Sequence, residues 1–501
     1  MSAPVRAKVV IVGAGISGIC AAIRLRQKGF DDIVVLEKAD AIGGTWRDNT
    51  YPGCACDVPS SLYSYSFAGK SSWSRFFARQ PEILEYINDV AKRFGVLDLI
   101  RFGECVEATS WDEDARHWTV RTGKRTYIAR FVISCGGYLH EPKIPNIPGL
   151  VEFPGTLFHS SRWRHDHDLR GRRVAVIGTG ASAIQFVPQI QPKVERLYLF
   201  QRTPQWLLPK IDAPIGRVAQ GVLALPGGKQ LLRNFLHRKF EEFGVAFRHP
   251  EHMKKAQSIA LRHLERSVKD PALRAKLTPK YVLGCKRVLL SSDYYPAVGQ
   301  PNVEVLATGV SSIRGSSLVG ENGEAREVDT IILGTGFYVT DPPIAARIRG
   351  ADGRSLAQIW AGSPEAYRGT TMAGFPNAFM VLGPNLAIGH NSAFLVVEAQ
   401  LDYIVDALCT ARRENLDRIE VRRDAQATYN RRVQRALTGT VWNTGGCSSY
   451  YIDANGKNST TFPWSTARMQ QILARFDLEN YHVLRARSKP ALASHQGAAH
   501  A

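Results

Sequence analysis

The chain has 501 residues, of which 44% are hydrophobic and 22% are charged, and this composition is typical of a globular protein with two or three domains. No apolar run reaches the roughly 18 residues that a membrane-spanning helix needs, so no membrane span is predicted. The net charge is +19, but Lys and Arg are scattered along the sequence, which favours a solvated basic surface over a nucleic-acid-binding site.

The first predicted unit is a strand, a glycine turn, a helix and a second strand. Residues 8–12 (KVVIV) and 33–36 (IVVL) are short, apolar and β-branched, as expected for buried strands. Between them lie the turn GAGISG at 13–18 and a helical pattern that ends at Gly29. A glycine turn that opens a helix presents free N–H groups to a pyrophosphate. This unit therefore predicts a dinucleotide site with contacts from Gly13, Gly15, Ser17 and Gly18.

A second unit of the same kind begins near the middle of the chain. Residues 173–177 (RVAVI) read as a strand, the turn GTGASA follows at 178–183, and residues 197–200 read as the next strand. A helix is expected to begin near Ser182. The turn predicts a second dinucleotide site with contacts from Thr179, Gly180, Ala181, Ser182 and Gln185.

The residue at the end of each second strand indicates which dinucleotide binds. Glu37 lies 24 residues after Gly13, and Arg202 lies 24 residues after Gly178. A carboxylate accepts hydrogen bonds from ribose hydroxyls and repels a 2′-phosphate, whereas a guanidinium pairs with the 2′-phosphate of NADPH. Two dinucleotide sites in one chain indicate electron transfer between a nicotinamide cofactor and a flavin. We therefore predict that FAD binds at the first site and NADPH at the second. Arg202 as an ordinary surface cation is the alternative.

These units predict an α/β fold with two Rossmann-like dinucleotide-binding domains and a helical insertion. Residues 211–280 lose the strand pattern and become amphipathic, and a third apolar strand at 330–333 runs into Gly334. The tail beyond about 485 is predicted to be disordered. The predicted domains are an FAD domain at 1–140 and 334–501, an NADPH domain at 141–210 and 281–333, and the insertion at 211–280.

The eight Cys show neither zinc-binding spacing nor a dense disulfide pattern, so no metal site is predicted, and reduced cysteines in a cytoplasmic protein are expected. Cys54 and Cys56 form a C-x-C pair. Flavin-dependent disulfide reductases instead place a C-x4-C in this region, so no catalytic redox role is predicted for the pair.

Further motifs lie between Lys8 and about Tyr481. They are a first fingerprint formed by Gly43–Trp46 with Tyr51–Gly53 and Asp57, a second fingerprint Phe153-x-Gly155-x3-His159-x3-Trp163, Cys285-Lys286-Arg287, Leu333–Phe337, and residues 442–464. In these motifs the chain resembles the class B flavoprotein monooxygenases, in particular the type I Baeyer–Villiger monooxygenases, with Gly334 in place of the family's Ala. One departure is Arg164, because the family usually has Pro or Asp directly after the Trp of the second fingerprint.

The resemblance implies that NADPH reduces FAD and that reduced flavin and O₂ form a C4a-peroxyflavin. This species inserts one oxygen next to a ketone carbonyl and yields an ester or lactone. Arg287 matches the arginine that stabilises the developing negative charge, and Asp57 matches the carboxylate that positions and balances it. Lys286 resembles the family's second contact to the 2′-phosphate of NADPH. Without the resemblance, Asp57 would read as a cap of the turn at 59–61, and Lys286 as a surface lysine.

The resemblance also implies further cofactor contacts, carried over by position. His159 is expected to be structural or to couple the domains. The FAD contacts are Glu37, Gly44, Thr45, Trp46, Asp48, Asp57, Tyr63, Val106 and Asn385, and the NADPH contacts are Cys56, Arg202, Thr203, Lys286 and Arg287.

Other functions compete with ketone oxygenation. The first is an N- or S-oxygenating flavin monooxygenase, and sulfide oxidation is compatible with the ketone reaction. The second is a disulfide reductase or NADPH oxidase, and the third is a nucleotide-binding redox sensor without catalysis. The particular ketone and the oligomeric state are left open.

Overall fold

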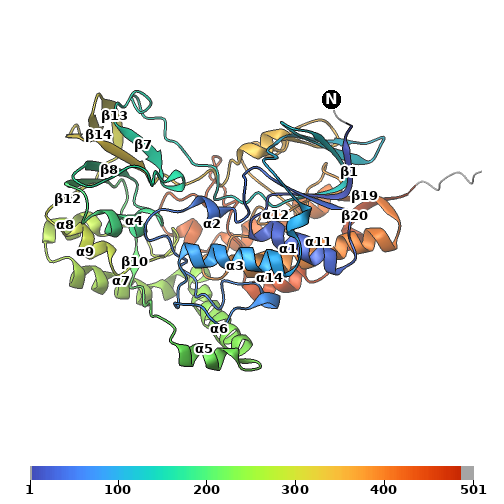
Figure 1. Ribbon diagram of the computed structural model, residues 1–501, viewed down its shortest axis with the longest axis horizontal. Coiled ribbons are helices and arrows are strands. Elements are labelled where there is room, and N and C mark those ends of the chain that lie inside the picture. Colours follow the sequence, from blue (N-terminus) through green and yellow to red (C-terminus); the bar gives the residue numbers. More distant parts are fainter. Residues whose placement is uncertain (1–2, 487–501) are drawn as a thin grey trace, which may run out of the picture.

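The structure is a computed structural model that describes residues 3–486, and it has two halves, each built on its own β-sheet (Figure 1). Within these residues the larger sheet has eight strands, in the order β17-β4-β5-β6-β1-β2-β3, with β18 also beside β6. The tail predicted to be disordered lies, from residue 487 on, outside the described residues. The strands are β1 (Val5–Val12), β2 (Ile33–Glu37), β3 (Ile100–Phe102), β4 (Val106–Asp112), β5 (His117–Thr122), β6 (Thr126–Ser134), β17 (Ile348–Arg349) and β18 (Ala378–Met380).

Strand β1 buries both of its faces, which explains its continuous apolar run. Val9 and Ile11 pack into the core beneath the helices, whereas Ala7 and Val10 pack into a second core beneath the antiparallel strands β4 to β6. β1 begins at Val5, earlier than predicted, because Val5 pairs with Tyr127 of β6, a partner that the local pattern does not reveal. The helices of this half include α1 (Ile16–Gln27), α3 (Gln80–Arg93), α11 (Ala393–Arg413) and α14 (Thr466–Leu473).

The smaller sheet is entirely parallel, in the order β12-β9-β8-β16-β7. It contains the strands predicted at 173–177, 197–200 and 330–333, so these elements are confirmed. Together with the larger sheet it confirms the predicted α/β class. The elements are β7 (Thr156–His159), β8 (Arg173–Ile177), β9 (Arg196–Phe200), β12 (Val303–Leu306) and β16 (Thr330–Leu333), the helices α4 (Ala183–Ile190) and α9 (Tyr294–Val298), and the antiparallel strands β13 (Val310–Arg314), β14 (Ser317–Gly320) and β15 (Ala325–Glu327).

Helices form over 211–280, as the sequence predicts, and they lie at the left and lower edges of the view in Figure 1. Helix α6 is tied to the larger half by two buried or half-buried charges. Arg233 donates to the carbonyl of Ser64 at 2.9 Å, and Glu241 accepts from His390 Nε2 at 3.0 Å. The boundaries of the three domains remain a prediction. The helices are α5 (Arg217–Ala224), α6 (Gly228–Arg248), α7 (Met253–Ser267) and α8 (Pro271–Leu277).

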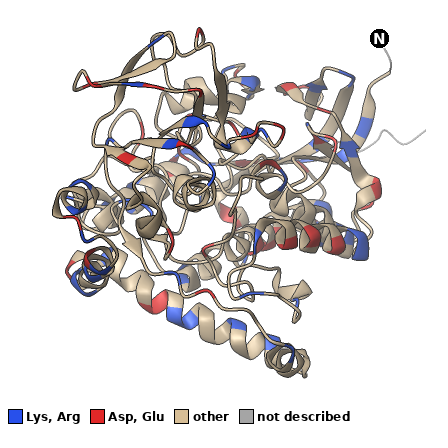
Figure 2. Cartoon of the chain, turned by 60° about the vertical axis from the view of Figure 1, so that its left-hand side comes forward, with Lys and Arg blue, Asp and Glu red and all other residues tan. Residues whose placement is uncertain are grey.

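The remaining short elements connect the two halves and complete the C-terminal region. Figure 2 shows Lys and Arg distributed over many helices, strands and loops, interspersed with Asp and Glu. Among the described residues, no helix is both long and apolar enough to cross a membrane. The short elements are α2 (Thr45–Asp48), β10 (Leu207–Leu208), β11 (Leu289–Leu290), α10 (Leu356–Trp360), β19 (Leu416–Val421), α12 (Arg423–Leu437), α13 (Val441–Thr444) and β20 (Tyr481–Arg485).

Candidate active site

The two glycine turns have the same geometry at the carboxyl ends of the two sheets. Gly13 has φ +105° and Gly178 has φ +100°, a region that residues with a Cβ rarely adopt. A Cβ on Gly13 would lie 2.7 Å from the carbonyl oxygen of Cys135, and one on Gly178 would lie 2.5 Å from that of Gly334. Each turn therefore runs directly against the residue that follows a neighbouring parallel strand, where dinucleotides bind in this class of fold.

Glu37 lies beneath the first turn and is only 4% exposed. Its Oε2 accepts a 2.8 Å hydrogen bond from the amide of Ala14, and its Oε1 accepts from the amide of Ala39 and from Arg47 Nη1, each at 3.0 Å. A carboxylate has about four acceptor positions, so Oε2 keeps capacity for a ribose hydroxyl. Glu37 thus shapes the turn and remains available for the predicted ribose contact.

The segment after helix α2 joins the two halves of the molecule. Gln185 of α4 accepts hydrogen bonds from the hydroxyl of Tyr51 at 3.0 Å and the amide of Ala55 at 3.3 Å, and its Nε2 donates to the carbonyl of Ala55 at 3.0 Å. Gly53 allows this contact, because a Cβ there would lie 2.6 Å from the carbonyl oxygen of Gln185. The first fingerprint therefore packs on the helix that opens the second dinucleotide site.

Arg202 and Lys286, predicted as contacts of the 2′-phosphate, lie close enough to repel each other. Burial and the Arg202 charge lower the pKa of Lys286, whose Nζ lies 5.3 Å from the centre of the Tyr281 ring. Within residues 3–486 neither cation forms an ion pair. Two adjacent cations without an anion fit a dianionic phosphate, and this supports the predicted role of both residues.

Arg287 and Asp57, 230 residues apart in sequence, form a forked ion pair. Arg287 Nη2 donates to Asp57 Oδ1 at 2.7 Å, and Arg287 Nε donates to Oδ2 at 3.0 Å. Burial raises the pKa of Asp57, but the Arg287 guanidinium outweighs this effect and holds the pKa below its usual value. Within the described chain Arg287 Nη1 makes no hydrogen bond, so the two N–H groups of Nη1 on this permanent cation are free to meet an anion.

Lys210 is a neighbour of this pair that the sequence did not single out. Its Nζ donates to the carbonyl of Cys56 at 3.3 Å, lies 5.1 Å from the centre of the Phe77 ring, and lowers the pKa of Asp57. A lysine in a loop that follows β10 carries no motif, so only the folded chain places it here.

The change Lys210→Met is expected to move the acid limb of the pH–activity profile to higher pH. A carboxyl with a lowered pKa keeps its ion pair above its unfolded-state pKa and loses it as pH falls through the folded-state pKa. Because removing Lys210 raises the pKa of Asp57, protonation breaks the Asp57–Arg287 pair at a higher pH, while turnover near neutral pH changes little. Profiles of kcat/KM for wild type, Lys210→Met and the exposed control Lys269→Met test this, and coinciding acid limbs would contradict it.

Three tyrosines lie near Arg287. Tyr138, Tyr450 and Tyr451 are close enough to Arg287 for mutual electrostatic effects, and burial together with Tyr450 raises the pKa of Tyr138 to about 12. Tyr450 and Tyr451 lie with their ring centres 4.6 Å apart. Burial also raises the pKa of Tyr451, so the hydroxyls of Tyr138 and Tyr451 stay protonated at neutral pH and add polar, aromatic groups near the guanidinium.

The other predicted FAD contacts group near the first turn and the larger sheet. Trp46 Nε1 donates to the Tyr63 hydroxyl at 3.1 Å. Asn385, at φ +56°, donates to the carbonyl of Asn458 at 2.9 Å and leaves its buried Oδ1 without a partner among the described residues. A Cβ on Gly44 would lie 3.1 Å from the Cα of Gly15, so the two glycines pack closely. Thr45 Oγ1 donates to the Leu139 carbonyl at 3.4 Å, and Arg47 Nε donates to Asp48 at 2.8 Å.

Two predicted NADPH contacts also lie together, because Thr179 Oγ1 donates to the carbonyl of Thr203 at 3.5 Å.

The second fingerprint lies away from the Arg287–Asp57 pair. His159 is 4% exposed, its Nδ1 accepts from the amide of Ser161 at 3.2 Å, and its ring packs edge-on against Phe337. Burial lowers the pKa of His159 to about 4, so the imidazole is neutral near pH 7. Arg164, the departure from the family pattern, points to solvent and pairs with Asp166 at 2.7 Å. This exposure explains why the position tolerates an arginine.

The expectation that all cysteines are reduced is wrong for one pair. Cys285 and Cys447 form a disulfide, with a Cα–Cα distance of 6.1 Å. They are 162 residues apart, so no local spacing of cysteines in the sequence predicts this disulfide. Cys54 and Cys56 are free and buried, and burial raises the pKa of Cys54 to about 11. Both are therefore protonated at neutral pH and are poor nucleophiles.

An apolar cavity on the β4–β6 side of the larger sheet borders the predicted flavin region. Its lining includes Val106, Trp118 and Phe375, and it reaches Tyr138 and Pro384. Neither Asp57 nor Arg287 lines it, so this cavity is not where the ion pair acts.

Two dinucleotide-type glycine turns together with a forked arginine–carboxylate pair are typical of a flavoprotein oxidoreductase that also uses a nicotinamide cofactor. The family "Flavin-binding monooxygenase-like" matches residues 6–348. The chain is 50% identical over 484 residues to a Baeyer–Villiger monooxygenase of Streptomyces coelicolor, covering 95% of this chain and 93% of the relative.

Solved structures give the same result. A closed crystal structure of cyclohexanone monooxygenase matches with a TM-score of 0.85 and 29% identity, over 97% of this chain and all (100%) of that one. Oxidised steroid monooxygenase bound to NADP matches with a TM-score of 0.84 and 29% identity, over 96% and 100%. The chain belongs to the flavin-binding monooxygenase family and, within it, to the Baeyer–Villiger type, as its motifs predict.

Proposed function

We propose that this protein is an FAD- and NADPH-dependent Baeyer–Villiger monooxygenase that converts a small-molecule ketone and O₂ into an ester or lactone. The observation that carries this proposal is Arg287, whose side chain is held by Asp57 and keeps Nη1 free. FAD, when bound, supplies the chemistry that takes a hydride from NADPH and activates O₂.

The residues of this chain supply binding, orientation and fixed charge. The turn at 13–18 and Glu37 bind FAD, the turn at 178–183 binds the NADPH pyrophosphate, and Arg202 with Lys286 binds the 2′-phosphate. Arg287 stabilises negative charge as oxygen transfers to the ketone carbon, because its charge is permanent and already oriented. Asp57 is a positioning residue that fixes the guanidinium plane and offsets its desolvation.

The two halves are held in register by the contact between Gln185 and residues 51–55. Cys56, the predicted neighbour of the nicotinamide, directly follows this contact and directly precedes Asp57 in the sequence. The two dinucleotides therefore approach each other where the arginine lies. The predicted domain boundaries and a cytoplasmic location are part of this proposal.

Product analysis tests the proposed function. Purified protein with NADPH and O₂ is incubated with linear, cyclic and aryl ketones and a thioether, and products are identified by mass spectrometry. We expect at least one ketone to gain one oxygen as an ester or lactone, with NADPH consumed in equal amount. Sulfoxide as the sole product would indicate the S-oxygenating alternative, and NADPH consumption with only H₂O₂ released would indicate an oxidase.

A further inference from the structure

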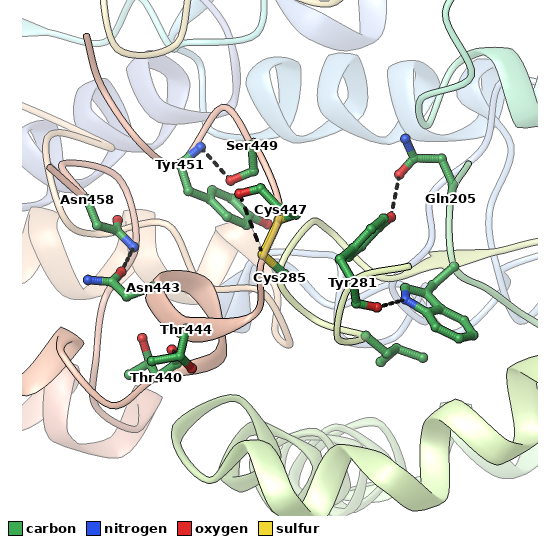
Figure 3. Close-up of a disulfide and its surroundings, with 12 residues drawn as sticks. Gln205, Tyr281, Cys285, Thr440, Asn443, Thr444, Cys447, Ser449, Tyr451 and Asn458 are labelled. Carbon is green, nitrogen blue, oxygen red and sulfur yellow. Dashed lines mark hydrogen bonds between the residues drawn. A yellow bond between two sulfur atoms is a disulfide. The ribbon is translucent and has the colours of Figure 1, made fainter. Parts of the chain in front are cut away.

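The disulfide lies directly beside the residues assigned to catalysis and NADPH binding. Cys285 immediately precedes Lys286 and Arg287, and Cys447 lies three residues before Tyr450. Figure 3 shows the bond between the two segments, with Tyr451 next to it. The chain's other six cysteines are free, so this pairing is selective.

The disulfide anchors a stretch that is otherwise mostly exposed. Trp442 and Tyr451 are buried at the ends of this stretch, with exposures of 3% each. Between them the side chains of Asn443, Thr444, Ser448 and Tyr450 are exposed, as is Gly446. We name residues 446–450 the tethered segment.

Few other bonds hold the tethered segment. The amide of Val282 donates to the carbonyl of Gly445 at 2.9 Å, just before the segment, and the amide of Tyr451 donates to Ser449 Oγ at 3.2 Å. Gly445 packs tightly on the disulfide, because a Cβ there would lie 2.6 Å from Cys285 Cβ. Loss of the S–S bond therefore removes the covalent contact between the segment and the Arg287 loop.

The two cysteines of the disulfide differ in exposure. Cys285 is 1% exposed, whereas Cys447 is partly exposed. A small thiol reaches Cys447 first, and disulfides with an accessible sulfur exchange more readily than buried ones.

We propose that Cys285–Cys447 is a reversible thiol–disulfide site that controls how firmly the tethered segment closes over Arg287. In the oxidised form Tyr450 and Tyr451 are held beside the guanidinium. In the reduced form the segment is released, and turnover falls. The kinetic part of this inference rests on the proposed function, whereas the chemical part does not.

The chemistry balances in both directions with small-molecule reactants. A thiolate RS⁻ attacks the Cys447 sulfur, the S–S bond breaks, and Cys285 leaves as a thiolate that takes a proton. A second thiolate RS⁻ attacks the RS sulfur of the mixed disulfide and breaks its S–S bond. This step gives RSSR and the Cys447 thiol after protonation, and two electrons are transferred in total. In the oxidising direction, the Cys447 thiolate attacks H₂O₂ to give a sulfenic acid and water, and Cys285 displaces a second water to restore the disulfide.

The chemical arm of the test counts thiols by alkylation under denaturing conditions and mass spectrometry. Protein purified without reductant is expected to carry six alkylated cysteines and a disulfide-linked pair of peptides containing Cys285 and Cys447. After native treatment with dithiothreitol and desalting, all eight of the chain's cysteines should be alkylated, and H₂O₂ should restore six. Eight alkylated cysteines in the untreated and the H₂O₂-treated protein would overturn the proposal.

The kinetic arm compares oxidised and reduced wild type with two variants. We expect reduction to lower ketone turnover several-fold, and Cys447→Ser to match the reduced enzyme whether or not dithiothreitol is added. Cys409→Ser, at a half-buried free cysteine of α11, should respond like wild type. Chemical reduction of wild type gives the same comparison without a substitution, so a poorly folded variant does not obscure the result.

Equal kcat and KM in the oxidised and reduced wild type would also overturn the proposal. If no ketone is converted, the proposed function is wrong. The proposal of a reversible disulfide is then tested by measuring the affinity for NADP⁺ and the number of free thiols. Reduction is expected to weaken NADP⁺ binding through the loop that carries Lys286. Unchanged affinity after reduction to eight thiols would overturn it.

Discussion

Arg287→Ala is expected to retain FAD and to lose nearly all ester formation. Removing one oriented donor that stabilises developing negative charge costs about 10²- to 10³-fold in kcat in enzymes that depend on such a donor. Arg287 is also a permanent cation, so the loss should lie at the upper end of that range or beyond. Flavin content follows from the absorbance of the purified protein, and ester formation follows from gas chromatography of the product.

Arg287→Lys separates charge from geometry in this experiment. Lysine keeps a positive charge but lacks the fork that pairs with both oxygens of Asp57, so we expect an intermediate activity. Arg170→Ala, which removes an exposed arginine paired with Asp168, is the control and should behave like wild type. If Arg287→Ala converts a ketone at the native rate, Arg287 does not have the assigned role.

Arg202→Ala is expected to raise the KM for NADPH by about 10- to 100-fold, the loss of one charge-assisted contact to phosphate, while the KM for NADH changes little. Only NADPH carries the 2′-phosphate, so only NADPH loses this contact. The residue follows β9, where side chains of this fold meet the ribose. Steady-state kinetics with both cofactors measure the effect.

Lys286 provides a second test of the same phosphate site. Lys286→Ala should also raise the KM for NADPH, and the double variant should favour NADH more than either single variant does. Because the two cations share one ligand group, their effects are not expected to add fully. Equal effects of Arg202→Ala on NADPH and NADH would remove the 2′-phosphate assignment.

Predictions from the sequence succeed where a function depends on residues close together in the chain. The turns at 13–18 and 178–183 lie within strand–turn–helix units of about thirty residues, and their glycines are required by backbone conformation and close approach. The matching offsets of Glu37 and Arg202 follow from the same local geometry. Elements of this kind are recognisable from periodicity alone.

The family resemblance also predicted the roles of Asp57 and Arg287, but it did not predict the residues around them. Lys210 belongs to no motif, and its place beside Cys56 depends on how the loop after β10 folds back on the first fingerprint. The early start of β1 likewise depends on β6, more than a hundred residues away. A local pattern contains no information about such partners.

By itself, then, the sequence determined the α/β class, the two glycine turns and the family, and it predicted FAD at the first turn and NADPH at the second. Only the tertiary structure decided that Arg287 pairs with Asp57 and leaves Nη1 free, that Tyr450 and Tyr451 lie near Arg287, and that Cys285 is bonded to Cys447. The physical reason is distance along the chain. Strand and helix patterns record each residue's near neighbours, whereas an ion pair across 230 residues and a disulfide across 162 exist only after the two halves have packed together.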